Sequence, residues 1–374
     1  MKPVVPPQGA RIAVAMSGGV DSSVVAALLI EQGYEVVGMM LTMWHDAACD
    51  TENRCCTPES VAEARRIAGS LGFPFYVIDA KKCFFDAVIQ NFIAGYSTGI
   101  TPNPCLLCNR DVRWNILLRE AEAAGCQYLA TGHYARLILD YTGVVHLLTG
   151  LDTNKDQSYV LSFLSQSALA KTFLPIGDME KTTVREHARR FGLEVAEKPD
   201  SQDLCFLGNS GLRDFLSRMA PESLLPGKIL LPNGTVIGEH QGLSCYTIGQ
   251  RKGIGLAAPK PLYVIEKNLK TNTLVVGYEE HLGRCKFNVI NPTWTCQKPP
   301  QSFPFECHIK TRYKAKPALC TVSISGEYSE AIGCAETIST LTVQTAEPIR
   351  DITAGQGAVL YHEDEVIGAG IIEI

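Results

Sequence analysis

The chain has 374 residues and a formal net charge of −5, from 34 Lys and Arg against 39 Asp and Glu. Its composition, 46% hydrophobic and 20% charged, is that of a globular protein and excludes disordered, fibrous and coiled-coil classes. The longest apolar run, Val24 to Ile30, is far shorter than a membrane span of about 20 residues, and the N-terminus lacks the apolar region of a signal peptide. We expect a cytoplasmic protein of two or three domains without a membrane partner.

Strands and helices are expected to alternate along the first half of the chain. Residues 11–16 form a short apolar run before a Gly-rich loop, as in a buried strand. Ser22 and Ser23 are expected to cap the following helix, which Gly33 ends. Further strands are expected at 35–41, 75–78 and 128–131, and further helices at 58–71, 82–96, 109–124 and 181–192. The alternation predicts βαβ units, and therefore a parallel sheet covered on both faces.

The pattern changes in the second half of the chain. After Pro226, short strands are separated by Gly, Pro and Asn turns, and from Phe287 onward the pattern is typical of an all-β barrel or sandwich. The expected fold class is therefore α/β: a Rossmann-like, doubly wound parallel sheet, then a small central β-rich domain and a C-terminal β-barrel. The expected domains are residues 1–214, 215–282 and 283–374.

A glycine- and serine-rich loop, SGGVDSS at residues 17–23, lies between the first strand and the first helix. Its glycines allow sharp turning and close approach to a ligand, and the helix that follows directs unpaired N–H groups at an anion. The three serine hydroxyls add donors, and Asp21 is suited to hold Mg²⁺ on bound phosphates. The structural alternative is an ordinary Gly-Ser turn. No Lys closes the loop, so it is not the G-x-x-x-x-G-K-[ST] loop, and it is not G-x-G-x-x-G.

The loop resembles the SGGxDS pyrophosphate loop of the N-type ATP pyrophosphatases, which cleave ATP between the α- and β-phosphates to adenylate a carbonyl oxygen. Other stretches narrow this resemblance to one family. They are TPNPCLLCNR at 101–110, ATGHY at 130–134, NKDQSY at 154–159, DSQDLCF at 200–206, GEHQG at 238–242 and TIGQRKG at 247–253. From about residue 11 to the C-terminus, the chain resembles the tRNA-specific 2-thiouridylases.

This resemblance implies an enzyme that converts the C2 oxygen of the wobble uridine into sulfur, using ATP, Mg²⁺ and a persulfide. It implies tRNAs of the Lys, Glu and Gln types as partners, and a cysteine desulfurase or sulfur-relay protein as sulfur donor. The implied nucleotide-binding residues are Ala15, Met16, Ser17, Gly18, Gly19, Val20, Asp21, Ser22, Leu41 and Gly132. The implied tRNA-binding residues are Asn103, Pro104, Cys105, His133, Lys155, Asp156, Gln157, Arg312, Tyr313 and Gln356.

Several of these residues also have a plain structural interpretation. Leu41 at the end of a strand is equally a core residue, and a lone His such as His133 is more often structural than functional. Asp156 could serve only as a helix cap. Among the 14 cysteines, most are expected to be buried small hydrophobes, and Cys49, Cys55 and Cys56 are treated as structural.

Cys108 and Cys205 lie in polar, turn-rich stretches, which favours reactive over buried thiols. Sulfur insertion needs one cysteine to carry the sulfur as a persulfide, and a second to help release it, leaving a disulfide. By resemblance, Cys205 is the carrier and Cys108 its partner. The alternative is two unrelated buried cysteines.

Cys105 departs from part of the family, in which an Asp stands three residues before the first catalytic cysteine. The spacing Cys105-x-x-Cys108, with Cys205 as a third ligand, could hold a [4Fe-4S] cluster with one open iron. The same three thiolates could instead bind Zn²⁺, or Cys105 could resolve a disulfide in a redox relay.

Basic residues recur at every second position from 310 to 316, namely Lys310, Arg312, Lys314 and Lys316. On a strand these side chains would share one face and form a stripe for RNA phosphates, with Tyr313 at its edge to stack on a base. The alternative is a solvated strand edge protected by lysines.

Two other functions compete with this hypothesis. One is another adenylating thiolase or amidotransferase on the same ATP-binding fold, acting on a different base or a small molecule. The other is a non-catalytic RNA-binding protein that keeps the loop as a relic. Mass analysis of tRNA nucleosides with and without the protein discriminates among them.

Overall fold

A computed structural model describes the chain except for residues 47–56, 200–203, 208–210, 326–327, 330–336 and 351. The predicted structural cysteines Cys49, Cys55 and Cys56 lie outside the described residues. Along the part that is described, no helix is long and apolar enough to cross a membrane.

The first part of the chain is built on a five-stranded parallel sheet with the order β4-β3-β2-β5-β8. Its strands are β2 (Arg11–Ala15), β3 (Glu35–Thr42), β4 (Phe75–Asp79), β5 (Tyr128–Ala130) and β8 (Thr172–Phe173). The strand order reverses on the two sides of β2, so the carboxyl ends of β2 and β5 meet at the place where such sheets bind ligands. The predicted Rossmann-like sheet is confirmed.

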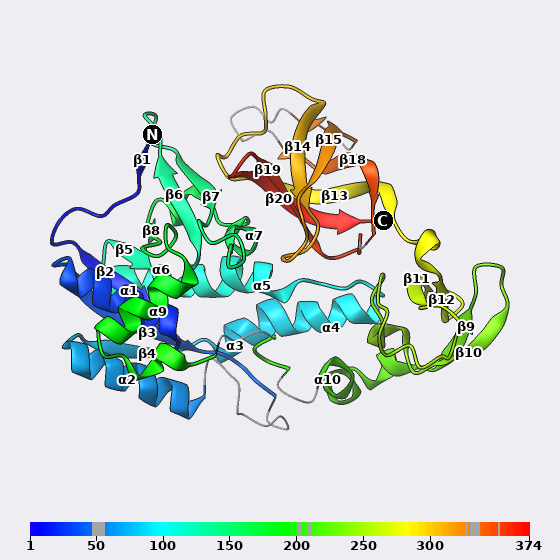
Figure 1. Cartoon of the computed structure of the whole chain (residues 1–374), viewed down its shortest axis with the longest axis horizontal. Helices are drawn as coiled ribbons and strands as arrows, with labels where there is room; N and C mark the ends of the chain where they lie inside the picture. The colour runs from blue at the N-terminus through cyan, green and yellow to red at the C-terminus, as the bar shows by residue number, and fades with distance from the viewer. Residues whose placement is uncertain (47–56, 200–203, 208–210, 326–327, 330–336, 351) are drawn as a thin grey trace.

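Helices cover both faces of this sheet (Figure 1). Successive residues of each strand point to opposite faces, so each face has apolar side chains for the helices to pack on. Ile12 and Val14 pack into the core that also holds residues of α1, α2 and α9, whereas Ala13 packs into a second core on the other face. On the first face lie α1 (Val20–Glu31), α2 (Pro58–Leu71), α9 (Lys181–Arg190) and η3 (Glu194–Glu197). The second core includes residues of α3 (Lys81–Phe84), η1 (Phe85–Ile89), α4 (Gln90–Ser97), α5 (Pro104–Leu107), η2 (Cys108–Trp114), α6 (Asn115–Ala123), α7 (Ser158–Leu161), α8 (Gln166–Leu169) and α10 (Gly211–Met219).

Two expectations for the helices need correction. Gly19, not Ser22 or Ser23, is the N-cap of α1, because both serines lie inside the helix and direct their hydroxyls back to the Gly19 carbonyl. The helix expected from 109 begins earlier, at Pro104, and runs through a π-helical segment, η2. Asn103 caps it by accepting the Cys105 N–H at 3.2 Å.

The C-terminal part is a closed antiparallel barrel in which β20 pairs with both β13 and β19. Its strands are β13 (Arg284–Trp294), β14 (Phe305–Lys310), β15 (Ala318–Ile324), β18 (Thr340–Ile349), β19 (Gly357–His362) and β20 (Glu365–Glu373). The short strands β16 (Tyr328–Ser329) and β17 (Thr337–Ile338) pair with each other. Its core contains Phe287, Val289, Ile309 and Val322. The sequence left barrel and sandwich open, and the barrel is confirmed.

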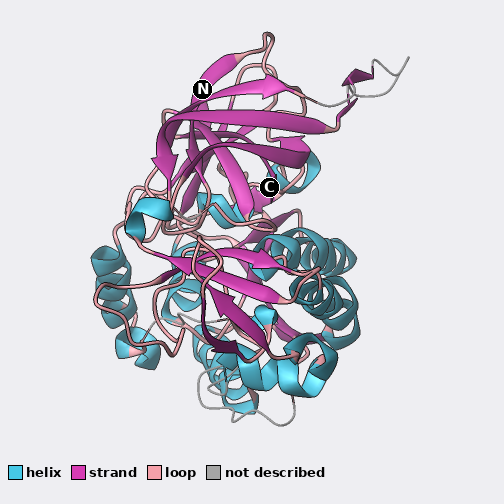
Figure 2. Ribbon diagram, turned by 90° about the vertical axis from the view of Figure 1, so that its right-hand side faces the viewer, coloured by secondary structure: helices cyan, strands magenta, loops and turns pink. Residues whose placement is uncertain are grey.

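The barrel is joined to the first part by sheet pairing as well as by the chain. Strands β1 (Lys2–Pro3), β6 (Ala135–Leu139) and β7 (Val145–Thr149) extend the barrel sheet through a β7–β20 pairing. Figure 2 shows the strand-rich barrel above the α/β part, with the N-terminus beside it.

Between them in the sequence lies a small module with its own core, formed by Ile229, Val264, Leu274 and Val276 among others. Its sheet has the order β10-β9-β12-β11, with β9 (Gly227–Leu230), β10 (Val236–His240), β11 (Tyr263–Asn268) and β12 (Thr273–Gly277). Short turns η5 (Pro221–Leu224), η6 (Leu243–Cys245) and η7 (Glu279–His281) flank it. The central β-rich domain is therefore confirmed.

Candidate active site and RNA-contacting surface

The loop at 17–23 turns sharply between β2 and α1 beneath the N-terminus of α2. Gly18 has φ +67°, and a Cβ there would lie 2.6 Å from the Ser60 carbonyl oxygen, so only glycine fits. The N-cap residue Gly19 offers no capping side chain. The first N–H groups of α1 therefore face the loop, as a phosphate requires.

The three loop serines were predicted to donate hydrogen bonds to phosphate, and the structure shows hydrogen bonds within the loop. Ser22 Oγ accepts the Ser17 N–H at 3.2 Å and lies 3.2 Å from Ser17 Oγ, which closes the loop on itself. Ser23 is fully buried and donates to the Gly19 carbonyl at 2.7 Å. The Ser23 hydroxyl therefore shapes the loop, and the expectation of three serine donors to phosphate is wrong at this residue.

Asp21, the predicted Mg²⁺ ligand, is already neutralised by other side chains. Lys181 Nζ donates to both of its carboxylate oxygens, at 2.7 and 2.8 Å, and the Tyr134 hydroxyl donates to one at 2.8 Å. Asp21 therefore fixes Lys181 beside the loop. Its role as a Mg²⁺ ligand stays a prediction.

Sequence reasoning missed two lysines at this loop. Lys181 begins α9 with its side chain only 11% exposed, and Lys198 Nζ donates to the Gly18 carbonyl at 2.8 Å. Both are far from the loop in the sequence, so no local pattern indicates them. Together with the positive end of α1, they give the loop a cationic environment that suits a polyphosphate.

Gly132 follows β5 and packs directly against this loop. A Cβ there would lie 2.9 Å from the Asp21 carbonyl carbon and 2.9 Å from the Ser22 nitrogen. The close approach that requires glycine is therefore to the loop backbone.

The residues before the loop and Leu41 are mostly core. Met16, Val20 and Leu41 are buried, and the Met16 N–H donates to the Met39 carbonyl at 2.8 Å. A pocket of about 650 Å³ opens at the carboxyl ends of β3 and β4 and is lined by Thr42, the residue after Leu41, but not by Leu41 itself. The core interpretation of Leu41 is thus confirmed, and its role at an adenine stays a prediction.

The cysteines differ in exposure from the expectation. Cys108 is buried, with 6% of its surface exposed, while Cys205 is half-buried. Both pack on the same core, where the neighbour of Cys205, Phe206, contacts the rings of Phe84, Phe92 and Phe215. The expectation that Cys108 is not buried is wrong, because its segment is helical and turns the side chain toward the core.

Of these three cysteines, Cys105 is the most exposed residue. Protein surrounds it on most sides, and this desolvation, with a contribution from Cys108, raises the pKa of its thiol to about 11, which Arg113 partly opposes. Among the described residues, one group of His, Cys, Asp or Glu side chains has three ligand atoms within 4.8 Å of one another. It consists of His146, Cys296 and Glu365 and includes none of these three cysteines. The structure therefore does not gather Cys105, Cys108 and Cys205 around a single zinc ion.

Some of the predicted tRNA-binding residues lie at the junction of the three parts of the chain. Arg312 donates to the Ile248 carbonyl of the central module at 3.1 Å and to Thr353 Oγ1 at 2.8 Å. Gln356 Nε2 donates to the Thr101 carbonyl at 2.8 Å, just before Asn103 and Pro104. Several predicted RNA contacts thus also hold the domains together.

Tyrosine rings continue this junction beside Cys105. Tyr313 lies edge-on to Tyr159 with 6.2 Å between ring centres, and the Tyr159 hydroxyl donates to the Gly357 carbonyl at 3.0 Å. Burial raises the pKa of Tyr313 to about 12, with Asp156 and Cys105 adding to the shift. Tyr313 is therefore a neutral aromatic surface next to the cysteine.

The segment 155–157 is largely occupied by structural contacts. Asp156 is buried, accepts the N–H groups of Gly150 and Ser158, and forms an ion pair with Lys310 at 3.0 Å. Gln157 Oε1 accepts the Tyr134 N–H at 3.0 Å. Asp156 therefore makes structural contacts, but the expectation that it caps the helix is wrong, because the N-cap of α7 is Gln157. Lys155 at the partly exposed end stays a predicted RNA contact.

The predicted basic stripe is wrong. Strand β14 ends at Lys310, and residues 311–317 form bends and turns, so the alternation does not place four cations on one strand face. Lys310 faces Asp156, and Arg312 donates to backbone and hydroxyl groups. Lys314 and Lys316 alone remain as exposed cations of this stretch.

His133 links the loop of β5 to the cysteine-bearing helix. Its Nδ1 lies 2.9 Å from Thr131 Oγ1, and its ring lies 5.4 Å from that of Trp114, the last residue of η2. Desolvation, helped by Arg113, lowers the pKa of His133 to about 3. The imidazole is therefore neutral and does not pair with phosphate by charge.

We expect His133 to make the protein less stable in mild acid. Because its pKa is about 3 when folded and near 6.5 when exposed, the unfolded chain binds more protons between these values. The free energy of unfolding should therefore fall as the pH drops from about 6.5, by about 2 kcal/mol at pH 5. Urea unfolding of wild type and His133→Asn at pH 7 and pH 5 tests this: the variant should lose less stability, and equal losses would contradict it.

Comparison with known proteins agrees with this arrangement. Residues 10–209 match a family model described as a tRNA methyl transferase HUP domain, 213–278 a tRNA methyl transferase PRC-barrel domain, and 284–372 an aminomethyltransferase beta-barrel domain. Distant likeness extends to a solved U34-tRNA thiolase from Methanococcus maripaludis, at 19% identity and a TM-score of 0.34, covering 57% of this chain and 68% of that one.

Curated relatives match over nearly the whole chain. The tRNA-specific 2-thiouridylase MnmA of Symbiobacterium thermophilum is 42% identical over 98% of this chain and 93% of its own length. That of Natranaerobius thermophilus is 41% identical over 97% of both. With matches of this extent, the chain belongs to the tRNA-specific 2-thiouridylase family.

Proposed function

We propose that the chain is an ATP-dependent enzyme that replaces the C2 oxygen of the wobble uridine of tRNA with sulfur. One continuous path of contacts supports this: the phosphate loop touches Gly132, its neighbour His133 touches Trp114, and Trp114 ends the helical segment that begins at Cys108. The loop and the thiols therefore serve one reaction.

In this proposal each group has a defined task. ATP supplies an AMP leaving group on the C2 oxygen, and the loop with Lys181 and Lys198 binds the phosphates. The terminal sulfur of a Cys205 persulfide attacks C2 and AMP departs. The Cys108 thiolate then attacks the Cys205 sulfur, which releases 2-thiouridine and leaves a Cys108–Cys205 disulfide for an external thiol to reduce.

The proposed partners follow from the reaction. A cysteine desulfurase or sulfur-relay protein supplies the persulfide, and tRNAs of the Lys, Glu and Gln types are the substrates. Mg²⁺ accompanies ATP as its counter-ion, and Asp21 stays its predicted ligand.

The family model's description mentions methyl transfer, whereas the curated relatives are named for thiolation. The buried and half-buried thiols that share one core favour sulfur chemistry. Mass analysis of tRNA nucleosides after incubation with ATP and a persulfide donor tests this. The 2-thiouridine should appear only with both added, and its absence when both are present would refute the proposal.

Replacing the exposed lysines 314 and 316 should weaken tRNA binding. If each neutralises one phosphate, Lys314→Ala with Lys316→Ala lowers the salt dependence of the binding constant by about one unit of slope per contact. ATP cleavage without tRNA should not change. Filter binding over a salt series measures the effect, and Lys298→Ala, at an exposed lysine, is the control. An unchanged slope would show that Lys314 and Lys316 do not contact tRNA phosphates.

A [4Fe-4S] cluster on Cys105, Cys108 and Cys205 is the alternative way to hold the sulfur. A cluster spreads its ligands more widely than one ion, so it is compatible with thiols that do not meet around a point. Anaerobic purification followed by iron and sulfide analysis decides between the two. Full activity of iron-free protein in air supports the two-cysteine relay, and activity that requires iron supports the cluster.

A further inference from the structure

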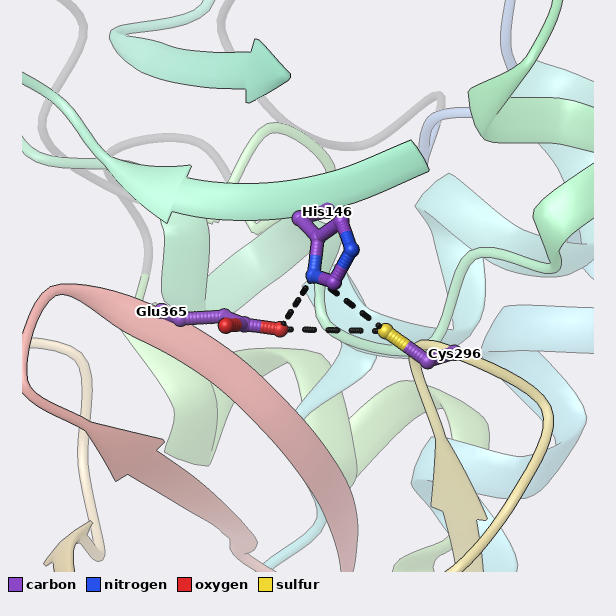
Figure 3. Close-up of side chains that lie close together, drawn as sticks. All are labelled: His146, Cys296 and Glu365. Carbon is purple, nitrogen blue, oxygen red and sulfur yellow. Dashed lines mark hydrogen bonds and ion pairs between the residues drawn. The ribbon is translucent and has the colours of Figure 1, made fainter. Parts of the chain in front are cut away.

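His146, Cys296 and Glu365 converge at one point (Figure 3). His146 Nδ1 lies 2.7 Å from Glu365 Oε1 and 3.5 Å from Cys296 Sγ, and the thiol lies 3.7 Å from the same carboxylate oxygen. All three ligand atoms lie within 4.8 Å of one another, and all three residues are partly buried.

The three residues come from separate parts of the chain. His146 lies on β7, Glu365 opens β20 opposite Leu148 of β7, and Cys296 lies two residues beyond β13. The turn that carries Cys296 is itself fixed: the Thr295 N–H donates to Ile367, and the Thr295 carbonyl accepts from Gln166 at 2.7 Å. The cluster is therefore held from three sides rather than assembled by one flexible loop.

A second carboxylate supports the imidazole from behind. Asp140 Oδ2 lies 3.4 Å from His146 Nε2, while its other contacts are with Thr142 and Val144. Among the described residues, neither Asp140 nor Glu365 forms an ion pair with a Lys or Arg. Two acids and a thiol thus surround one imidazole. A carboxylate behind a histidine is the usual support of a metal-binding imidazole.

The spacing agrees with one metal ion. Bonds of about 2.3 Å to sulfur and about 2.0 Å to nitrogen and oxygen place tetrahedral ligand atoms about 3.3 to 3.6 Å apart. The sulfur–nitrogen distance of 3.5 Å already lies in this range. The sulfur–oxygen pair must close slightly from 3.7 Å, and the nitrogen–oxygen pair must open from 2.7 Å. A mixed thiolate, imidazole and carboxylate set is typical of zinc.

We propose that His146, Cys296 and Glu365 form a Zn²⁺ site, with Asp140 as the residue that positions His146. On binding, the Cys296 thiol releases its proton, and His146 releases the Nδ1 proton that it shares with Glu365, both to solvent. The neutral imidazole then carries its proton on Nε2, facing Asp140, so that Nδ1 binds the ion. Water fills the fourth position. The ion would join β7 of the α/β part to β20 and the end of β13, and so fasten the barrel to the first domain.

Zinc binding by the full-length protein tests this directly. After removal of metals with a chelator, the protein is titrated with Zn²⁺ and the bound metal is counted by mass spectrometry. We expect one zinc whose affinity falls at least 100-fold in Cys296→Ser and His146→Gln. Asp140→Asn should weaken it about 10- to 100-fold. Cys285→Ser, a half-buried cysteine on β13 itself, should bind as wild type does.

Two further measurements separate this site from the other thiols and from misfolding. The variant with Cys105, Cys108 and Cys205 all changed to serine should keep the zinc. With Co²⁺ in place of zinc, a thiolate-to-metal absorption band should appear in this triple variant and vanish on adding Cys296→Ser, while the circular dichroism of both stays the same. Loss of the zinc in the triple variant, or equal zinc affinity in wild type and Cys296→Ser, would overturn the proposal.

Discussion

Cys205→Ser is expected to abolish 2-thiouridine formation and the uptake of sulfur from a persulfide donor. The half-buried Cys205 is the proposed carrier, so serine leaves no atom on which the donor can load sulfur. Labelled sulfur on the protein, followed after gel filtration, and nucleoside mass analysis measure the two losses.

Cys108→Ser should separate the two steps. It should still accept labelled sulfur from the donor but should accumulate tRNA joined to Cys205 through a disulfide, because the thiolate that releases the product is missing. Added dithiothreitol should then free 2-thiouridine. Cys126→Ser, another buried cysteine on the same core, is the matched control and should retain activity. Label retained by Cys205→Ser would show that the roles are exchanged.

Asp21→Ala should lose ATP-dependent pyrophosphate release by about 100-fold or more while tRNA binding stays nearly intact. The carboxylate fixes Lys181 and Tyr134 beside the phosphate loop, and without it the lysine charge is no longer aimed at that place. The residues at the tRNA junction belong to other elements. Pyrophosphate release and filter binding of tRNA measure the two activities on the same preparation.

Lys181→Met tests whether the cation itself acts on the nucleotide. If Asp21 serves mainly to hold Lys181, the two variants should show similar losses, and the double variant should be little worse than either. Asp86→Asn, which breaks an exposed Asp–Lys pair with Lys82, is the control and should leave the rate unchanged. Normal pyrophosphate release by Asp21→Ala would contradict the assignment of the loop.

Local signals explain why much of the fold could be predicted. The helix at 58–71 was predicted to the residue because Thr57 caps it, Pro58 occupies its first turn, and Gly72 ends it in the left-handed conformation. The parallel sheet followed from apolar runs that alternate with such helices. These signals all lie within a few residues of the element that they specify.

The site could be predicted only where its residues are neighbours in sequence. Asp21 and Lys181 are separated by 160 positions, and His146 and Cys296 by 150, so no spacing rule indicates either pair. The stripe at 310–316 was wrong although its residues are neighbours in sequence. Basic residues at every second position are also compatible with a turn, and the strand ends at Lys310. Tertiary contacts decide both cases, and the sequence does not carry them locally.

The junction built by Arg312 and Gln356 has a consequence for how the enzyme can vary. Both side chains donate to main-chain carbonyls, of Ile248 and Thr101 respectively. A carbonyl is present whatever the residue, so the accepting positions are free to change side chain without loss of the bond, whereas the donating positions are not. The accepting positions should therefore tolerate substitution better than the donating positions. A library that varies positions 101 and 248 should yield many more functional chains than one that varies positions 312 and 356.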